Sequence, residues 1–210
     1  MRVKRNVYLI LSLACILLGM AACSPVMPVT EQTSQTAPAE QTGPFHPLSA
    51  RTGNENIDPI LEAVASGDRQ ALISLVQLTE AVCTHADGLG GPPKCRDGEA
   101  EGTAMDVLPF LGGEGSYLRS EEIGDWQGID VSALYAVYEV SPENVVQEEY
   151  FPAGEYVIVL IGGENQSPVA LRVTDGRIVR VDFLFEPTPE ALNPLLEREA
   201  ARVILPPKNP

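Results

Sequence analysis

Two cysteines and a histidine near the middle of the chain allow two kinds of chemistry. Cys83, His85 and Cys95 could bind zinc, with Asp87 or Asp97 as a fourth ligand. The two cysteines could instead form a disulfide that closes a loop of about a dozen residues. The Cys-x-His spacing fits structural zinc sites poorly, and an exported pair of thiols oxidises. We therefore predict the disulfide, provided that the chain is exported.

Other motifs that carry chemistry are missing from the sequence. It contains no G-x-S-x-G, H-E-x-x-H, paired C-x-x-C or P-loop motif. Gly88-Leu89-Gly90-Gly91 lacks the strand-to-helix setting and the third glycine of a dinucleotide site. We predict that the protein has no metal site and needs no cofactor.

The first 23 residues have the order of an export signal. The segment starts with positive charge at Arg2, Lys4 and Arg5. An apolar run follows at residues 8–18, and a small-residue boundary follows at residues 19–22. A transmembrane helix needs about 20 apolar residues, more than this run provides. The segment ends at Cys23 and resembles the lipobox of bacterial lipoproteins, with Met20 where leucine is usual.

This resemblance implies that residues 1–22 are a signal peptide and that Cys23 is lipidated. Lipoproteins of this family carry a diacylglycerol on the cysteine, and two or more acyl chains anchor a protein stably. The expected location is the cell membrane, with the protein facing outside the cytoplasm. An ordinary cleaved signal peptide without lipid is the alternative. Cys15 leaves with the signal in either case, so Cys83 and Cys95 remain to pair.

The charge of the chain excludes one class of partner. Three of the 14 Lys and Arg lie in the first 22 residues, which leaves 11 basic and 29 acidic residues and a formal charge of −18. Such a surface repels phosphate backbones and anionic headgroups. We predict no nucleic-acid partner and contact with the membrane only through the N-terminal lipid.

The composition divides the rest of the chain into three parts. Residues 23–54 are rich in Pro, Thr, Gln, Ala and Glu and predict a disordered tether. Residues 55–187 predict one α+β domain. Residues 188–210 predict a tail with a short helix that begins near Asn193 and Pro194.

Two helices are predicted to precede a β-rich region. Asp58 predicts a helix start with Pro59 in the first turn, and Asp68 predicts a second start directly after Gly67. The remaining elements predicted are a strand, a short helix and four further strands: residues 105–111, 119–126, 133–140, 156–161, 169–174 and 177–185.

The dipeptide Asp175-Gly176 predicts a hairpin between the last two strands. A two-residue loop would place Leu171 beside Arg180, whereas a three-residue loop would place Leu171 beside Val179. A one-residue slip turns every side chain to the other face. We therefore predict the three-residue loop, with Gly176 in the left-handed region.

The order of elements is similar to that of the cone-shaped NTF2-like family, in which helices pack on a curved antiparallel sheet. The pattern Gly67-Asp68-x-x-Ala71-Leu72-x-x-Leu75 resembles the early helices of that family. The alternative is another two-layer α+β fold.

Enzymes of the NTF2-like family use Asp, Tyr or His inside the cone, so the resemblance implies a pocket with Asp106, Trp126 and Tyr135 as candidate residues. Strand alternation places Tyr135 and Tyr138 on opposite faces. The alternative is that these aromatic side chains are core packing.

We therefore expect a lipid-anchored extracytoplasmic domain that binds a small apolar molecule, a peptide or an envelope protein. The alternatives are a pocket enzyme with a buried Asp or Glu as general base beside a tyrosine, and a structural envelope lipoprotein.

Overall fold

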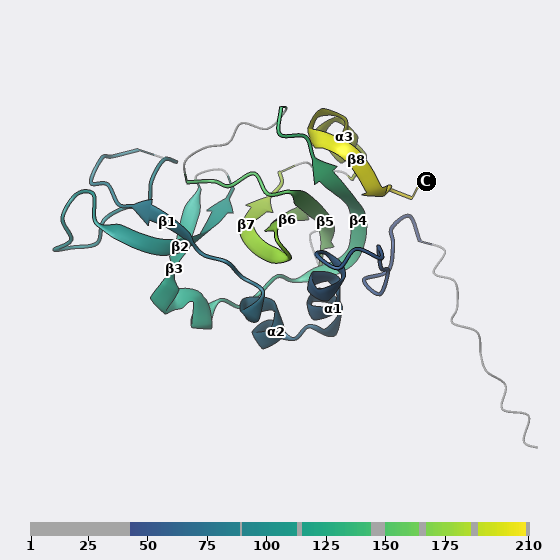
Figure 1. Cartoon of the computed structure of the whole chain (residues 1–210), viewed down its shortest axis with the longest axis horizontal. Helices are drawn as coiled ribbons and strands as arrows, with labels where there is room; N and C mark the ends of the chain where they lie inside the picture. The colour runs from purple at the N-terminus through teal and green to yellow at the C-terminus, as the bar shows by residue number, and fades with distance from the viewer. Residues whose placement is uncertain are drawn as a thin grey trace, which may run out of the picture. The chain divides into compact units, whose positions relative to one another are not determined.

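The computed structural model describes residues 43–88, 90–112, 115–143, 150–163, 167–185 and 189–208. Its fold is α+β, with one large sheet and few helices (Figure 1). Within the described residues no helix has the length and apolar character to span a membrane. The predicted lipobox and Cys23 lie outside the described residues.

The sheet has eight strands in the order β1-β2-β7-β6-β5-β4-β8, with β3 paired to β2. Neighbouring strands are antiparallel except for β2 and β7, which run parallel. The strands are β1 (Thr79–Val82), β2 (Ala104–Leu111), β3 (Ser116–Arg119), β4 (Val131–Val140), β5 (Tyr156–Gly162), β6 (Pro168–Thr174), β7 (Arg177–Phe183) and β8 (Ala200–Leu205).

Two α-helices precede the sheet: α1 (Asp58–Ser66) and α2 (Arg69–Ser74). Gly67 ends α1 with a φ of 66°, and the Asp68 carboxylate accepts hydrogen bonds from the N–H groups of Gln70 and Ala71, as predicted. Asp58 is not the N-cap, because Ile57 occupies that position. The Asp58 carboxylate instead accepts hydrogen bonds from Thr52 and Gly53 at 2.8–2.9 Å, and so binds the preceding segment to the helix.

The sheet is buried on both faces. The first apolar cluster contains residues of α1 and α2 with Val137, Ile158 and Leu171. The second contains Tyr138 and Val159 with Leu192 and Leu196. These last two belong to a short 3₁₀ helix, η2 (Pro189–Leu192), and to α3 (Asn193–Glu199). Strands covered on both sides read as continuous apolar runs, as most of β4 does.

The hairpin between β6 and β7 has a two-residue loop, and the predicted three-residue loop is wrong. Thr174 pairs with Arg177 and Val173 pairs with Ile178. Asp175 and Gly176 have φ angles of 49° and 71°, so Gly176 is left-handed as predicted. A bulge then accommodates Val179, and Leu171 pairs with Val181. The bulge restores the apolar alignment that we expected the longer loop to provide.

The folded unit is longer at both ends than the predicted limits of 55 and 187. The described residues before position 55 and after position 187 belong to the same compact unit as the rest. His46 forms a backbone bridge with Leu134 of β4. The segment predicted as a tail contains the expected helix, α3, but continues into β8, which pairs with β4.

The short helix predicted at 119–126 is a 3₁₀ helix, η1 (Ser120–Asp125).

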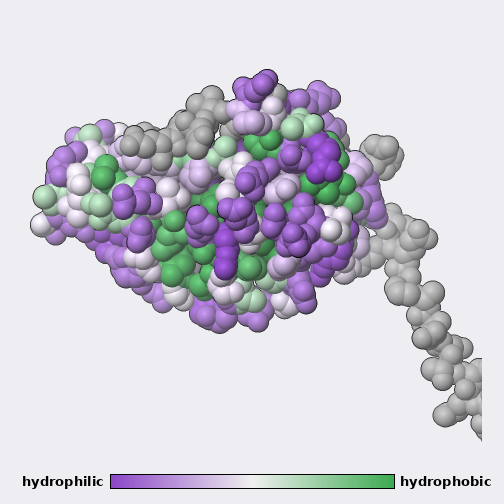
Figure 2. All heavy atoms as spheres, viewed as in Figure 1, coloured by the Kyte–Doolittle hydropathy of each residue, from purple (hydrophilic) through white to green (hydrophobic). Residues whose placement is uncertain are grey.

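Hydrophilic residues cover much of the face shown in Figure 2, and hydrophobic residues show between them near the middle.

Candidate functional site

Cys83 and Cys95 form a disulfide with an S–S distance of 1.98 Å, which agrees with the predicted pairing. In the described residues, two groups of side chains lie close enough together to bind one metal ion. One group is Cys83, Cys95 and Glu99, and the other is His85, Cys95 and Glu101. Both depend on a cysteine of the disulfide, whose sulfur is not a thiolate ligand.

The three predicted pocket residues do not meet. Asp106 is exposed on β2, where it pairs in register with Glu80. Trp126 packs in the first cluster, with its ring 5.9 Å from that of Phe110. Tyr135 packs in the second cluster on the other face of the sheet, and its hydroxyl bonds to Asn193 at 2.8 Å. The structure does not bring these three residues together, and the two aromatic side chains pack in different apolar clusters.

The expected alternation along β4 is also broken. Tyr135 and Tyr138 both belong to the second cluster. A register shift between Leu134 and Ala136 inserts one residue into the strand. The inserted residue moves the second tyrosine to the same face as the first.

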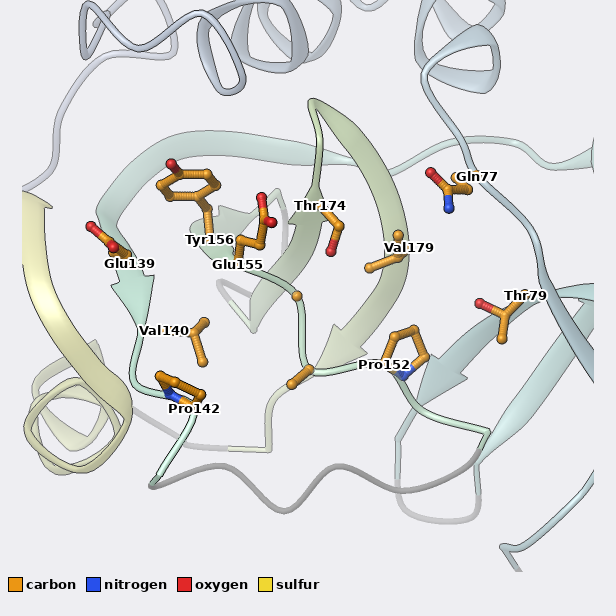
Figure 3. Close-up of a pocket in the computed structure, with 12 residues that line it drawn as sticks. Gln77, Thr79, Glu139, Val140, Pro142, Pro152, Glu155, Tyr156, Thr174 and Val179 are labelled. Atoms are coloured by element: carbon orange, nitrogen blue, oxygen red, sulfur yellow. The ribbon is translucent and has the colours of Figure 1, made fainter.

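A pocket of about 670 Å³ lies at one end of the curled sheet (Figure 3). Its lining comes from strand ends and from the segment before β5. The lining residues are Gln77, Thr79, Glu139, Val140, Pro142, Pro152, Ala153, Gly154, Glu155, Tyr156, Thr174 and Val179.

Strand register positions these side chains. Glu139 pairs with Tyr156 across β4 and β5, and Tyr156 pairs with Val173 across β5 and β6. The β7 bulge at Val179 brings that side chain to the lining. The Gln77 N–H donates to the Ile178 carbonyl at 2.9 Å and holds the chain before β1 beside β7.

Several polar groups of the pocket are free to bind a ligand. Within the described part of the chain, the side chains of four lining residues make no hydrogen bond: Gln77, Thr79, Tyr156 and Thr174. Glu155 accepts one hydrogen bond from the Asp175 N–H at 3.3 Å. Glu139 pairs with Arg202 of β8 at 2.9 Å, and this pair is exposed.

Two buried arginines hold the wall formed by residues 151–153. Arg172 donates to the Ala153 carbonyl at 3.1 Å, and Arg180 donates to the carbonyls of Phe151 and Pro152 at 3.1 and 3.3 Å. Both arginines lie on the face of the second cluster, because their strand neighbours Leu171 and Val181 belong to the first. The wall therefore separates the pocket from a buried charge network.

The network is electrically balanced. Arg172 and Arg180 share the Asp182 carboxylate, and Arg172 also reaches Glu199 at 2.9 Å. The Tyr138 hydroxyl donates to Glu199 at 3.0 Å. Among the described residues, no buried side-chain nitrogen or oxygen lacks a hydrogen-bond partner.

The network also shifts two pKa values. Burial, followed by the nearby Glu199 carboxylate, raises the pKa of Tyr138 well above its usual range. Burial lowers the pKa of Arg172, but Asp182 and Glu199 outweigh this effect and the pKa is raised. Arg172 therefore stays charged, and Tyr138 stays a neutral donor.

Sequence reasoning missed both the network and the pocket lining. The signal for the network was present: Arg172, Arg180 and Asp182 interrupt strands that are otherwise apolar. Their burial depends on α3 and Glu199, which cover that side of the sheet. The pocket lining has no sequence signature, because it combines segments from residue 77 to residue 179.

The chain was compared with protein-family models, with curated protein sequences and with solved structures, and no match was found in any of the three.

Proposed function

We propose that the protein is a lipid-anchored, extracytoplasmic domain that binds a small molecule in the pocket at the end of the curled sheet. The observation that carries this proposal is a pocket of about 670 Å³ whose lining includes four polar side chains without a partner in the described residues. Pockets for small molecules have volumes of about 300–1,000 Å³ and combine apolar walls with a few polar groups.

The anchor is proposed from the N-terminal pattern that ends at Cys23. Metabolic labelling with a palmitate analogue tests it. We expect label on the wild-type protein and none on a Cys23→Ala variant. Equal labelling of the two, or no label on the wild type, contradicts the anchor without affecting the pocket.

A pocket-filling variant tests ligand binding. Thr174 lies at the end of β6 and lines the pocket, so Thr174→Phe should occupy part of its volume. We expect small molecules that raise the melting temperature of the wild type to have no effect on Thr174→Phe. Gln70→Phe, at an exposed position on α2 outside the lining, is the matched control and should respond as the wild type does.

The finer NTF2-like assignment is also a proposal. A helix pair and a curled, largely antiparallel sheet with a pocket support it. The alternative of a pocket enzyme would use Glu139 or Glu155 as general base beside Tyr156, since these residues lie together in the lining. It would not use Asp106, which is exposed on β2. Conversion of a bound molecule by the wild type, but not by Glu155→Gln, would favour the enzyme.

A further inference from the structure

We propose that the ligand of this pocket is a small organic cation with an ammonium group on a short apolar body. This inference rests on the proposed function, because it names the chemistry of the ligand. It is argued from the charge of the lining, from the Tyr156 ring and from the apolar side chains near it.

The charged groups of the described lining are all negative. It contains the carboxylates of Glu139 and Glu155 and no lysine, arginine or histidine. Within the described residues Glu155 accepts a single hydrogen bond, from the Asp175 N–H. This bond is long at 3.3 Å and leaves most of the acceptor capacity of the carboxylate unused there. An ammonium group would form a charge-assisted hydrogen bond there.

An aromatic ring lies beside these carboxylates. Glu139 and Glu155 lie on either side of the Tyr156 ring in the view of Figure 3. Glu139 and Tyr156 are also direct partners in the β4–β5 register, so their side chains share one face of the sheet. The face of an aromatic ring attracts a cation. A ligand without charge would use neither the carboxylates nor the ring in this way.

The rest of the lining suits an apolar body. In the view of Figure 3, Val140 and Pro142 lie below Tyr156 and Pro152 lies below Val179, and all three present apolar surface. Val179 adds a further apolar side chain from β7. The ligand is therefore amphipathic, with its ammonium group near the carboxylates and its hydrocarbon part against the prolines.

Arg202 does not prevent this binding. Its side chain is 67% exposed and its partner Glu139 is 41% exposed. Exposed ion pairs contribute little free energy, so a ligand ammonium can replace the guanidinium. A metal ion fits this pocket less well than an ammonium group does. In the described residues, neither group of side chains close enough together to bind one metal ion includes Glu139 or Glu155.

Isothermal titration of the full-length protein with three ring compounds of similar size tests the inference: cyclohexylamine, cyclohexanol and cyclohexanecarboxylate. The amine is protonated at neutral pH, as a lysine side chain is. We expect it to bind at least about tenfold more tightly than the other two, because a charged hydrogen bond is lost in each of them. Glu155→Gln and Glu139→Gln should each weaken amine binding by about tenfold or more and leave cyclohexanol binding unchanged. Glu62→Gln, at an exposed position on α1 outside the lining, should change neither.

Tyr156→Leu removes the aromatic ring and should weaken amine binding. If the alcohol or the carboxylate binds as tightly as the amine, and Thr174→Phe abolishes that binding, the pocket binds a ligand but the cation inference is wrong. Displacement of the amine by calcium at a similar concentration would also overturn it, in favour of a metal site. If none of the three compounds binds, and no compound in a wider set of small molecules is blocked by Thr174→Phe, the proposed function fails as well.

Discussion

Arg180 donates two parallel hydrogen bonds to the carboxylate of Asp182, two residues further along the same strand. The Nε–Oδ1 distance is 2.6 Å and the Nη2–Oδ2 distance is 2.8 Å. Residues i and i+2 of a strand share a face, so β7 presents a complete ion pair from its own sequence. The pair is 3–6% exposed, and Arg180 donates from its Nη1 group to the carbonyls of the pocket wall.

Asp182→Asn should destabilise the protein strongly, because it leaves Arg180 and Arg172 without the carboxylate that they share. Breaking a buried pair in this way costs about 3–5 kcal/mol in the free energy of unfolding. Urea denaturation measures the loss. Glu121→Gln removes one partner of the exposed pair with Arg96 and should change the free energy by less than about 1 kcal/mol. If Asp182→Asn and Glu121→Gln lower the free energy of unfolding by similar amounts, burial does not make the Asp182 pairs more important than the exposed pair.

Removing both members of the pair should be less harmful than removing one. The double variant Arg180→Leu/Asp182→Leu leaves Arg172 paired with Glu199 and no uncompensated buried charge. Buried pairs replaced by apolar residues are often neutral or stabilising. We expect the double variant to unfold at higher urea concentration than Asp182→Leu alone, and a double-mutant cycle measures the coupling. An additive cycle would show that the pair does not act as a unit.

Gly154→Ala should destabilise the pocket wall. Gly154 has a φ of +75°, and an added Cβ would lie 3.0 Å from the Val173 nitrogen. Alanine in a left-handed backbone conformation already lowers the free energy of unfolding by roughly 1 kcal/mol relative to glycine. The lack of space for a Cβ at Gly154 adds to this loss. The control is Gly124→Ala, where a Cβ meets nothing within 4 Å and φ is not positive. Thermal melts of the two variants should separate clearly. Equal melting temperatures would contradict the close approach of Gly154 to β6.

The stability of the disulfide region should depend on pH through Glu99. Hydrogen bonds from the Arg119 guanidinium and from the Arg96 N–H lower the pKa of Glu99 from its usual 4.5 to about 2. Because the folded state holds the carboxylate ionised, its contribution is complete above pH 4.5 and is lost as the pH falls towards 2. Melting temperatures across this range should fall more steeply for the wild type than for Glu99→Gln. Parallel profiles would mean that Glu99 titrates alike in the folded and unfolded states.

Local chemistry in the sequence determined several parts of this protein. Gly67 and Asp68 separate the two helices because a left-handed C-cap and a carboxylate N-cap are local interactions. The strands around residues 104–111, 131–140, 156–162, 168–174 and 177–183 appear as apolar or β-branched runs between turn residues, and the α+β class follows from them. The pairing of Cys83 with Cys95 followed from counting the cysteines that remain after an export signal.

The tertiary structure alone decided register, burial and the site. The bulges beside Val179 and Tyr135 insert single residues, and each reverses every face assignment that follows it along the strand. Arg172 is buried against Glu199, which lies 27 positions further along the chain, a contact that no local pattern encodes. The pocket is likewise made by segments far apart in sequence: Glu155 and Tyr156 are adjacent in the chain, but Glu139 joins them only through the β4–β5 register.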